Sequence, residues 1–217
     1  MPFSSVLGAS SVIKPGVCTS TTRPTVPYEG QLIYETDTDR VAAYNGSAWV
    51  YTATSGMVLL ASATLSAATS FTIDNVFSSQ YRFYRLMLNS TLNSANITCQ
   101  LRSAGTTRVN DYNYQYIVGS GTTAAAARGT GQASLWIGAF GGGFGALDCL
   151  IVNPASAVRT SFITQNVYGA SFSDVNLDVI TFNGNHNVQF AYDGIIVSAA
   201  NANTLTGAYS LYGFAGA

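Results

Sequence analysis

The sequence predicts an all-β protein: an antiparallel, jelly-roll-like β-sandwich over residues 56–217, preceded over residues 1–55 by an extended N-terminal arm and a small three-stranded meander. Three observations predict this class. Glu occurs only at Glu29 and Glu35 and Lys only at Lys14, so the best surface helix formers are nearly absent. Runs of alternating apolar and polar residues recur about every ten residues, as they do in sandwiches and barrels. No segment has the pattern of a crossover helix, which excludes a parallel α/β sheet.

The first 55 residues differ in character from the rest of the chain. Residues 1–23 are rich in Ser and Thr and lack sustained alternation, so we expect an extended arm that orders against a partner. In residues 24–52, QLIYE and RVAAY predict strands joined by the turn TDTD, and an Asn-Gly pair turns the chain into AWVYT. The residues expected to share one face are Ile33, Val41, Tyr44 and Trp49. Three strands this short make a thin core, so the meander should need a neighbour to pack against.

About ten strands are expected after residue 56. In ANITCQLRS, Ile97, Cys99 and Leu101 alternate with polar residues and should face the core. The run Ala124 to Ala127, between two glycines, is too short to nucleate a helix, and we expect a loop there. The expected strands lie at residues 57–65, 70–77, 81–90, 95–103, 113–119, 134–138, 147–153, 159–164, 175–182, 193–198 and 206–214.

One segment of the N-terminal part carries a family resemblance. RPTVPYEGQLIYETDTDRVAAYNGSAWV, residues 23–50, resembles a short module found near the ends of many tailed-bacteriophage virion proteins, including minor tail, tail-fibre and head-fibre proteins. The matching residues are Arg23, Pro24, Pro27, Gly30, Gln31, Ile33, Tyr34, Thr36, Asp37, Thr38, Arg40, Tyr44, Gly46 and Trp49.

The C-terminal sequence, residues 190–217, is similar to the closing strands of phage β-sandwich fibre and decoration domains. A DGI strand precedes a turn there, and a TGxxxxYG strand follows it. The matching residues are Asp193, Gly194, Ile195, Thr206, Gly207, Tyr212 and Gly213. The resemblance implies a structural, usually trimeric role in a virion, assembled in the cytoplasm of the bacterial host. The stretch between residues 53 and 189 carries no such resemblance.

The residues of the module also have a direct physical interpretation. Asp37 and Asp39 can accept main-chain N–H bonds and set the hairpin turn, and Arg40 can pair with Glu35 or Asp37 across it. Calcium binding by this acidic pair is an open alternative, although the full EF-hand pattern is missing. Pro24 and Pro27 stiffen an extended stretch of chain, which suits packing along another subunit.

Aromatic residues form the second candidate site. YNYQY should place Tyr112, Tyr114 and Tyr116 on one face of a strand, and Trp136 lies in another expected strand. Such a face can form core pairs, subunit contacts or a platform on which sugar rings stack. We therefore keep Tyr112, Tyr114, Tyr116 and Trp136 as candidate subunit or glycan contacts.

Catalytic chemistry is not expected. His186, the only histidine, lies in GNHNV and is expected in a solvent-facing loop, and no GxSxG motif is present. Asp174 with Asp178, or Asp148 with Asp193, could converge as in a glycosidase, but turn and surface roles are favoured. The three cysteines have neither disulfide-framework nor zinc spacing. No cofactor and no metal site are predicted.

Charge and hydropathy limit the partners. Nine basic and ten acidic residues give a net charge of -1, which disfavours nucleic acid. No apolar run approaches the roughly 18 residues of a membrane span, and the first residues lack the pattern of a signal peptide. With only 9% charged residues, we expect the chain to associate with itself, and a trimer would bury its apolar faces. The resemblance to virion proteins implies other proteins of the capsid or tail as further partners. A host surface glycan is the alternative partner, in an adhesin role.

Overall fold

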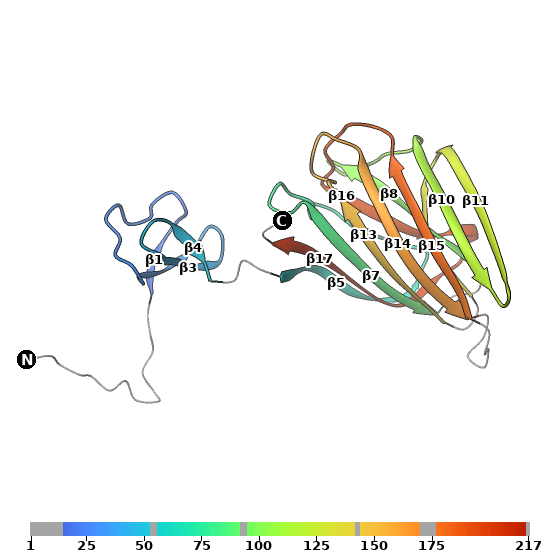
Figure 1. Ribbon diagram of the computed structural model, residues 1–217, viewed down its shortest axis with the longest axis horizontal. Coiled ribbons are helices and arrows are strands. Elements are labelled where there is room, and N and C mark those ends of the chain that lie inside the picture. Colours follow the sequence, from blue (N-terminus) through green and yellow to red (C-terminus); the bar gives the residue numbers. More distant parts are fainter. Residues whose placement is uncertain (1–14, 53–55, 92–94, 142–143, 170–176, 216–217) are drawn as a thin grey trace, which may run out of the picture. The chain divides into compact units, whose positions relative to one another are not determined.

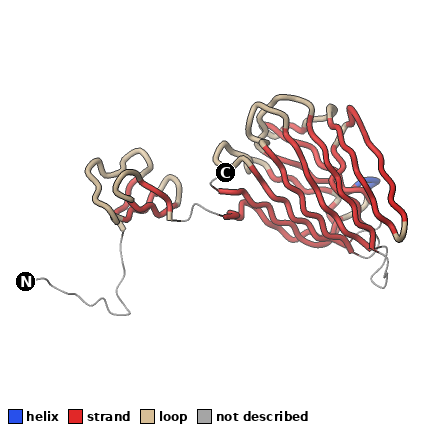
Figure 2. The backbone as a smooth tube through the Cα atoms, in the orientation of Figure 1, coloured by secondary structure: helices blue, strands red, loops and turns tan. Residues whose placement is uncertain are grey.

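The computed structural model describes residues 15–52, 56–91, 95–141, 144–169 and 177–215. The chain divides into two compact units, Met1–Ser55 and Gly56–Ala217. Both are built from strands and loops (Figures 1 and 2), and the helical structure in the described ranges is a single 3-10 turn at Ala200–Ala202. None of the described residues forms a helix long and apolar enough to cross a membrane.

The N-terminal unit is a four-stranded sheet in the order β1-β2-β3-β4. The expected antiparallel meander is formed by β2 (Leu32–Glu35), β3 (Arg40–Tyr44) and β4 (Trp49–Tyr51). A fourth strand, β1 (Gly16–Cys18), pairs in parallel with β2 and was not expected from the sequence. Of the expected arm, residues 1–14 lie outside the described ranges.

The C-terminal unit is an antiparallel sandwich of two sheets. The larger sheet has the order β11-β10-β15-β14-β13-β7-β17-β5, and the smaller has the order β12-β8-β16-β6, with β9 paired to β8. Figure 1 shows β7, β13, β14, β15, β10 and β11 side by side in one layer. The bounds are β5 Gly56–Ala68, β6 Ser70–Ile73, β7 Phe83–Thr91, β8 Ala95–Ser103, β9 Thr106–Thr107, β10 Tyr112–Ser120, β11 Thr123–Gln132, β12 Leu135–Phe140, β13 Phe144–Val152, β14 Thr160–Gly169, β15 Leu177–His186, β16 Gly194–Ala199 and β17 Leu205–Ala215.

The strand order is that of a jelly roll. When β5, β6, β7, β8, β12, β13, β16 and β17 are lettered B to I along the chain, one sheet contains B-I-D-G (β5-β17-β7-β13) and the other is C-H-E-F (β6-β16-β8-β12). The four further strands β10, β11, β14 and β15 all extend the larger sheet beyond β13. The expected all-β, jelly-roll-like fold class is thereby confirmed.

The core lies between the two sheets and follows from period-two alternation. Ile97, Cys99 and Leu101 of β8 are buried as expected, and Tyr84 and Leu86 of β7 are fully buried in the same cluster. Cys149 of β13 is also buried in it, and all three cysteines are free thiols.

The expectation of a loop at residues 124–127 was wrong. These alanines lie in β11, which pairs with β10 from Tyr112 opposite Gln132 to Ser120 opposite Thr123. Gly121, at φ 57°, allows the tight turn between the two strands. An edge strand of small residues has little side chain to bury, and it is held by the main-chain ladder, which residue propensities do not reveal.

Candidate functional site

The carboxylate of Glu35, at the end of β2, organises the N-terminal unit. It is fully buried, and its Oε1 accepts a hydrogen bond of 2.5 Å from Arg23 Nε. Its Oε2 accepts bonds of 2.9 Å from the Tyr51 hydroxyl and 2.9 Å from Thr38 Oγ1. Arg23 also donates to the Tyr51 hydroxyl over 3.2 Å. One carboxylate thereby ties together β2, β4, the β2–β3 turn and the loop before β2.

These contacts fix the ionised state of the pair. The hydrogen bond from Arg23 lowers the pKa of Glu35, against the opposing effect of burial, and the Tyr51 and Thr38 hydroxyls lower it further. The same bond raises the pKa of Arg23. A charged bond between a guanidinium and a carboxylate is stronger than a neutral one, so this pair is the main polar determinant of the small unit.

The two turn aspartates hold separate parts of this unit. Asp37 accepts from the Ser20 main-chain N–H at 2.8 Å and from Ser20 Oγ at 2.6 Å, which fastens β1 to the β2–β3 turn. The Tyr34 hydroxyl donates to Asp39 over 2.5 Å. The two carboxylates are thus engaged by different groups, and no group of three or more metal-ligating residues occurs in the described ranges. The ion-pair partner of Glu35 is Arg23, whereas the guanidinium of Arg40 lies 4.9 Å from the centre of the Tyr51 ring.

The other residues of the module shape the same unit. The ring centres of Tyr44 and Trp49 are 5.4 Å apart across the β3–β4 hairpin. Gly30, at φ 85°, donates its N–H to the Tyr44 carbonyl over 2.8 Å. Pro24 and Pro27 lie in the connection between β1 and β2 and are partly buried.

The N-terminal sheet has one buried face and one exposed apolar face. Ile33 and Ala42 are paired neighbours on the buried face, next to Glu35. The opposite face carries Val17, Leu32, Tyr34, Val41, Ala43 and Val50, which we call the apolar face of the N-terminal sheet. The expectation that Val41 faces the same side as Ile33 was wrong, because the register pairs Ile33 with Ala42 and so turns Val41 outward.

This exposed face is a candidate binding surface that the sequence reasoning missed. Val17, Leu32, Val41 and Val50 are 36–61% exposed in the described part of the chain. The strand sequence does contain a sign of this face, since the adjacent apolar residues Leu32 and Ile33 of one strand must point to opposite faces of the sheet. A strand with large apolar residues at both odd and even positions favours burial on both sides.

The aromatic candidates of the jelly roll occupy two environments. Tyr112 is fully buried: its hydroxyl accepts from the Leu101 N–H at 2.8 Å and donates to the Arg108 carbonyl at 3.0 Å. Burial raises the pKa of Tyr112. It is therefore a core residue and cannot contact a sugar or another subunit.

The remaining three aromatic rings form a half-buried stack between the two sheets. Trp136 of β12 lies 5.4 Å from the Tyr114 ring at an interplanar angle of 12°, and 5.9 Å from Tyr116 of β10. Tyr116 also contacts Phe182 of β15 at 5.2 Å. The three rings thus pack against one another at the edge of the sandwich. This arrangement corresponds to the first of the three alternatives, core pairs between strands.

His186 does not lie in a solvent-facing loop, as the sequence analysis expected, but is buried at the end of β15. Its Nδ1 lies 2.7 Å from the Tyr192 hydroxyl, and its ring packs 4.5 Å from that of Tyr112. Burial lowers the pKa of His186. The polar sequence around His186 gave no sign of this, because Tyr192 lies in the loop that follows β15 and Tyr112 comes from β10.

The described members of the acidic pairs considered for hydrolysis interact with other residues. Asp148 of β13 is bound by Arg85 of β7, and Asp193 accepts the Ala104 N–H over 2.8 Å at the start of β16. Burial and, after it, the hydrogen bond with Asp178 raise the pKa of Tyr168 to about 12, while Asp174 lies outside the described residues. Asp148, Asp178 and Asp193 therefore each have a structural partner.

Comparison with known proteins adds no relative. No protein family, curated protein or solved structure matches this chain.

Proposed function

We propose that this chain is a non-enzymatic structural component of a tailed-phage virion, a minor tail or fibre protein. The N-terminal unit, residues 1–55, anchors it to the particle, and the jelly roll, residues 56–217, projects from the anchor as part of a homotrimer. The observation that carries the proposal is the exposed apolar face of the N-terminal sheet, in a separate unit whose sequence resembles virion modules.

The small size of the N-terminal sheet supports an anchoring role. A four-stranded sheet of short strands buries one face under its own loops, and the Glu35–Arg23 pair holds those loops in place. The second face remains apolar, with Leu32 and Val50 on neighbouring positions of β2 and β4 to either side of Ala43. A sheet this small is marginal in water and gains stability when its second face is covered by a partner.

Placement on the capsid, as a head fibre or a decoration protein, is the alternative within this class. The proposed anchoring face is uncharged, and it fits an apolar strip on a capsid or a tail protein equally well. Labelling the protein on intact particles separates the two, because signal on the head excludes a tail fibre and signal on the tail excludes a decoration protein.

A carbohydrate-binding adhesin is the second candidate, favoured only by the half-buried stack of Tyr114, Tyr116 and Trp136. Because the rings stack on one another, each has limited free face for a sugar. Glycan-array binding that is lost on Trp136→Ala in a folded protein would favour this role over the structural one.

The anchoring face is tested in particles that carry a variant as their sole copy of the protein. Leu32→Asp places a charge in the centre of the proposed contact, and we expect the variant to be lost from purified particles. Val26→Asp is the matched control, because Val26 is 89% exposed in a loop outside the sheet, and it should be incorporated normally. Normal incorporation of a folded Leu32→Asp protein would refute anchoring by this face.

A further inference from the structure

The two outer faces of the sandwich differ in chemistry. The outer face of the smaller sheet is mostly polar, with Thr98, Gln100 and Arg102 on β8 facing away from the core. By contrast, among the described residues of the C-terminal unit, seven of the eleven exposed large hydrophobic side chains lie on the outer face of the larger sheet. They are Met57, Leu59, Met87, Ile117, Ile163, Leu177 and Val179. The other four lie in loops, so the apolar surface of this unit is concentrated on one face.

The middle of this face is hollow. Its side chains form a cavity of about 560 Å³, lined by residues of β7, β13, β14, β15 and β17. The strand register explains the shape, because it aligns Ala208, Asn89, Ala146, Val167 and Val179 in one row across the sheet. Small side chains in that row leave a depression between larger neighbours.

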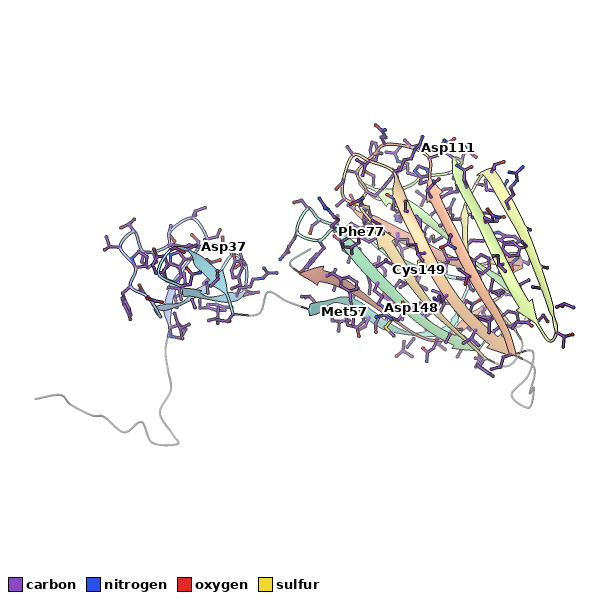
Figure 3. The ribbon with its side chains drawn as sticks, viewed as in Figure 1. Asp37, Met57, Phe77, Asp111, Asp148 and Cys149 are labelled. Atoms are coloured by element: carbon purple, nitrogen blue, oxygen red, sulfur yellow. The ribbon has the colours of Figure 1, made fainter. Side chains whose placement is uncertain are left out.

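The two charged side chains beside the hollow, Arg85 and Asp148, form an ion pair, and a third, Arg128 of β11, is exposed on the same face. Arg85 Nε donates to Asp148 Oδ1 over 2.8 Å, and a second guanidinium nitrogen binds the other carboxylate oxygen. Figure 3 labels Asp148 on this face, next to Cys149, which is buried on the inner side of β13. Because the pair balances itself, the region around the hollow offers no net charge that would select a partner of opposite charge.

The size of the face matches a stable protein interface. Eight strands about 4.8 Å apart, each about nine residues long, give a face of roughly 1,000 Å². A standard interface buries about 800 Å² on each partner. A surface of this size, on which the exposed large hydrophobic residues gather around a hollow, is sufficient for a contact between identical subunits.

We propose that the outer face of the larger sheet is the surface through which copies of this chain bind one another. The inference rests on the self-association included in the proposed function and assigns a surface to it. An apolar surface of a second copy of the chain fills the hollow, and the identical subunits together form a closed oligomer. The main driving force is the removal of the seven exposed hydrophobic side chains from water.

The test is the mass of the full-length chain in solution, measured by sedimentation velocity at micromolar concentrations. Val179 lines the hollow and is 58% exposed, so Val179→Asp should fold and should reduce the mass from a small multiple of one chain to a single chain. Ile163→Asp, at a second position of the same face, should do the same. Val158→Asp, 44% exposed in the loop between β13 and β14, is the matched control and should leave the oligomer intact. Circular dichroism and thermal unfolding confirm that each variant is folded.

Three results would overturn the inference: a monomeric wild-type protein, an oligomer that survives both charged substitutions, or an equal loss with the control. The result of this oligomer test does not depend on whether the N-terminal unit anchors the protein to a particle. An oligomer that dissociates on Val179→Asp supports this interface even if the protein never joins a particle, whereas a monomer that still joins particles removes the interface and leaves the anchor.

Discussion

Replacement of Glu35 by Gln should specifically destabilise the N-terminal unit. The substitution keeps the shape of the side chain but removes its charge and turns one acceptor oxygen into a donor. Whichever way the amide is oriented, an NH2 group then faces either Arg23 Nε or the hydroxyls of Tyr51 and Thr38. Glu29, the only other glutamate, is exposed, so Glu29→Gln is a matched control.

The magnitude follows from the bonds that are lost. A hydrogen bond to a charged group contributes about 1.5–3 kcal/mol, and a neutral one contributes about 1 kcal/mol. Loss of one hydrogen bond to a charged group and one neutral hydrogen bond therefore costs about 3 kcal/mol. The roughly 3–5 kcal/mol for breaking a deeply buried pair is an upper limit, because the Arg23 side chain is 30% exposed. The 38 residues 15–52 should have a total stability of only roughly 2–6 kcal/mol. The variant unit should therefore lose between about half and all of its stability.

Tryptophan fluorescence can follow each unit separately, because the chain has one tryptophan in each. In a Trp136→Phe background only Trp49 emits, and it packs against Tyr44 in the N-terminal unit. Urea unfolding of this background should show a large loss of stability with Glu35→Gln and almost none with Glu29→Gln. A change below about 0.5 kcal/mol for Glu35→Gln, the size of an ordinary surface substitution, would refute the role assigned to this carboxylate.

Three further predictions concern the C-terminal unit. Because the pKa of His186 is lowered from 6.5 in the folded protein, the unfolded chain binds a proton more readily, so the unfolding temperature should fall as the pH drops below about 6.5. An unfolding temperature that does not change with pH, or one that changes equally in His186→Gln, contradicts this. Gly207→Ala should cost about 1–3 kcal/mol or more, since its Cβ would lie 2.1 Å from the Asn89 carbonyl oxygen. Gly119→Ala, with 3.9 Å to its nearest neighbour, should show little change in the same denaturant titration. A thiol reagent should modify Cys18 first, because burial raises the pKa of both other thiols; early reaction of more than one thiol in the native protein contradicts the buried core.

The jelly roll could be predicted because alternation carries most of its information. In β8 every second residue from Ile97 to Leu101 is buried, and the expected strands correspond to observed ones throughout the C-terminal unit. The prediction for residues 124–127 was wrong because alanine favours helices and is depleted in strands, whereas pairing with β10 makes this segment a strand.

The polar interior could not be predicted in the same way. His186 and Tyr192 are near in sequence, but the ring of Tyr112, which packs against His186, comes from another strand. The partner of Glu35 was equally hard to predict. Arg40 lies opposite Glu35 in the hairpin register, yet Glu35 forms an ion pair with Arg23 from a loop. Side-chain pairing across loops depends on three-dimensional packing, which local spacing does not encode.

The two proposed contact surfaces share one sequence signature, which explains why composition indicated association before any surface was known. A strand with one face in water should alternate apolar and polar residues. Here Leu32 with Ile33 in β2, Phe162 with Ile163 in β14, and Val179 with Ile180 in β15 break that alternation, each pair placing one large apolar residue on either side of its sheet. The inner member of each pair is buried within its own unit, and the outer member is exposed in the single chain. These outer residues stay exposed unless another surface covers them, and we propose that the particle covers those of the N-terminal sheet and a second copy covers those of the jelly roll.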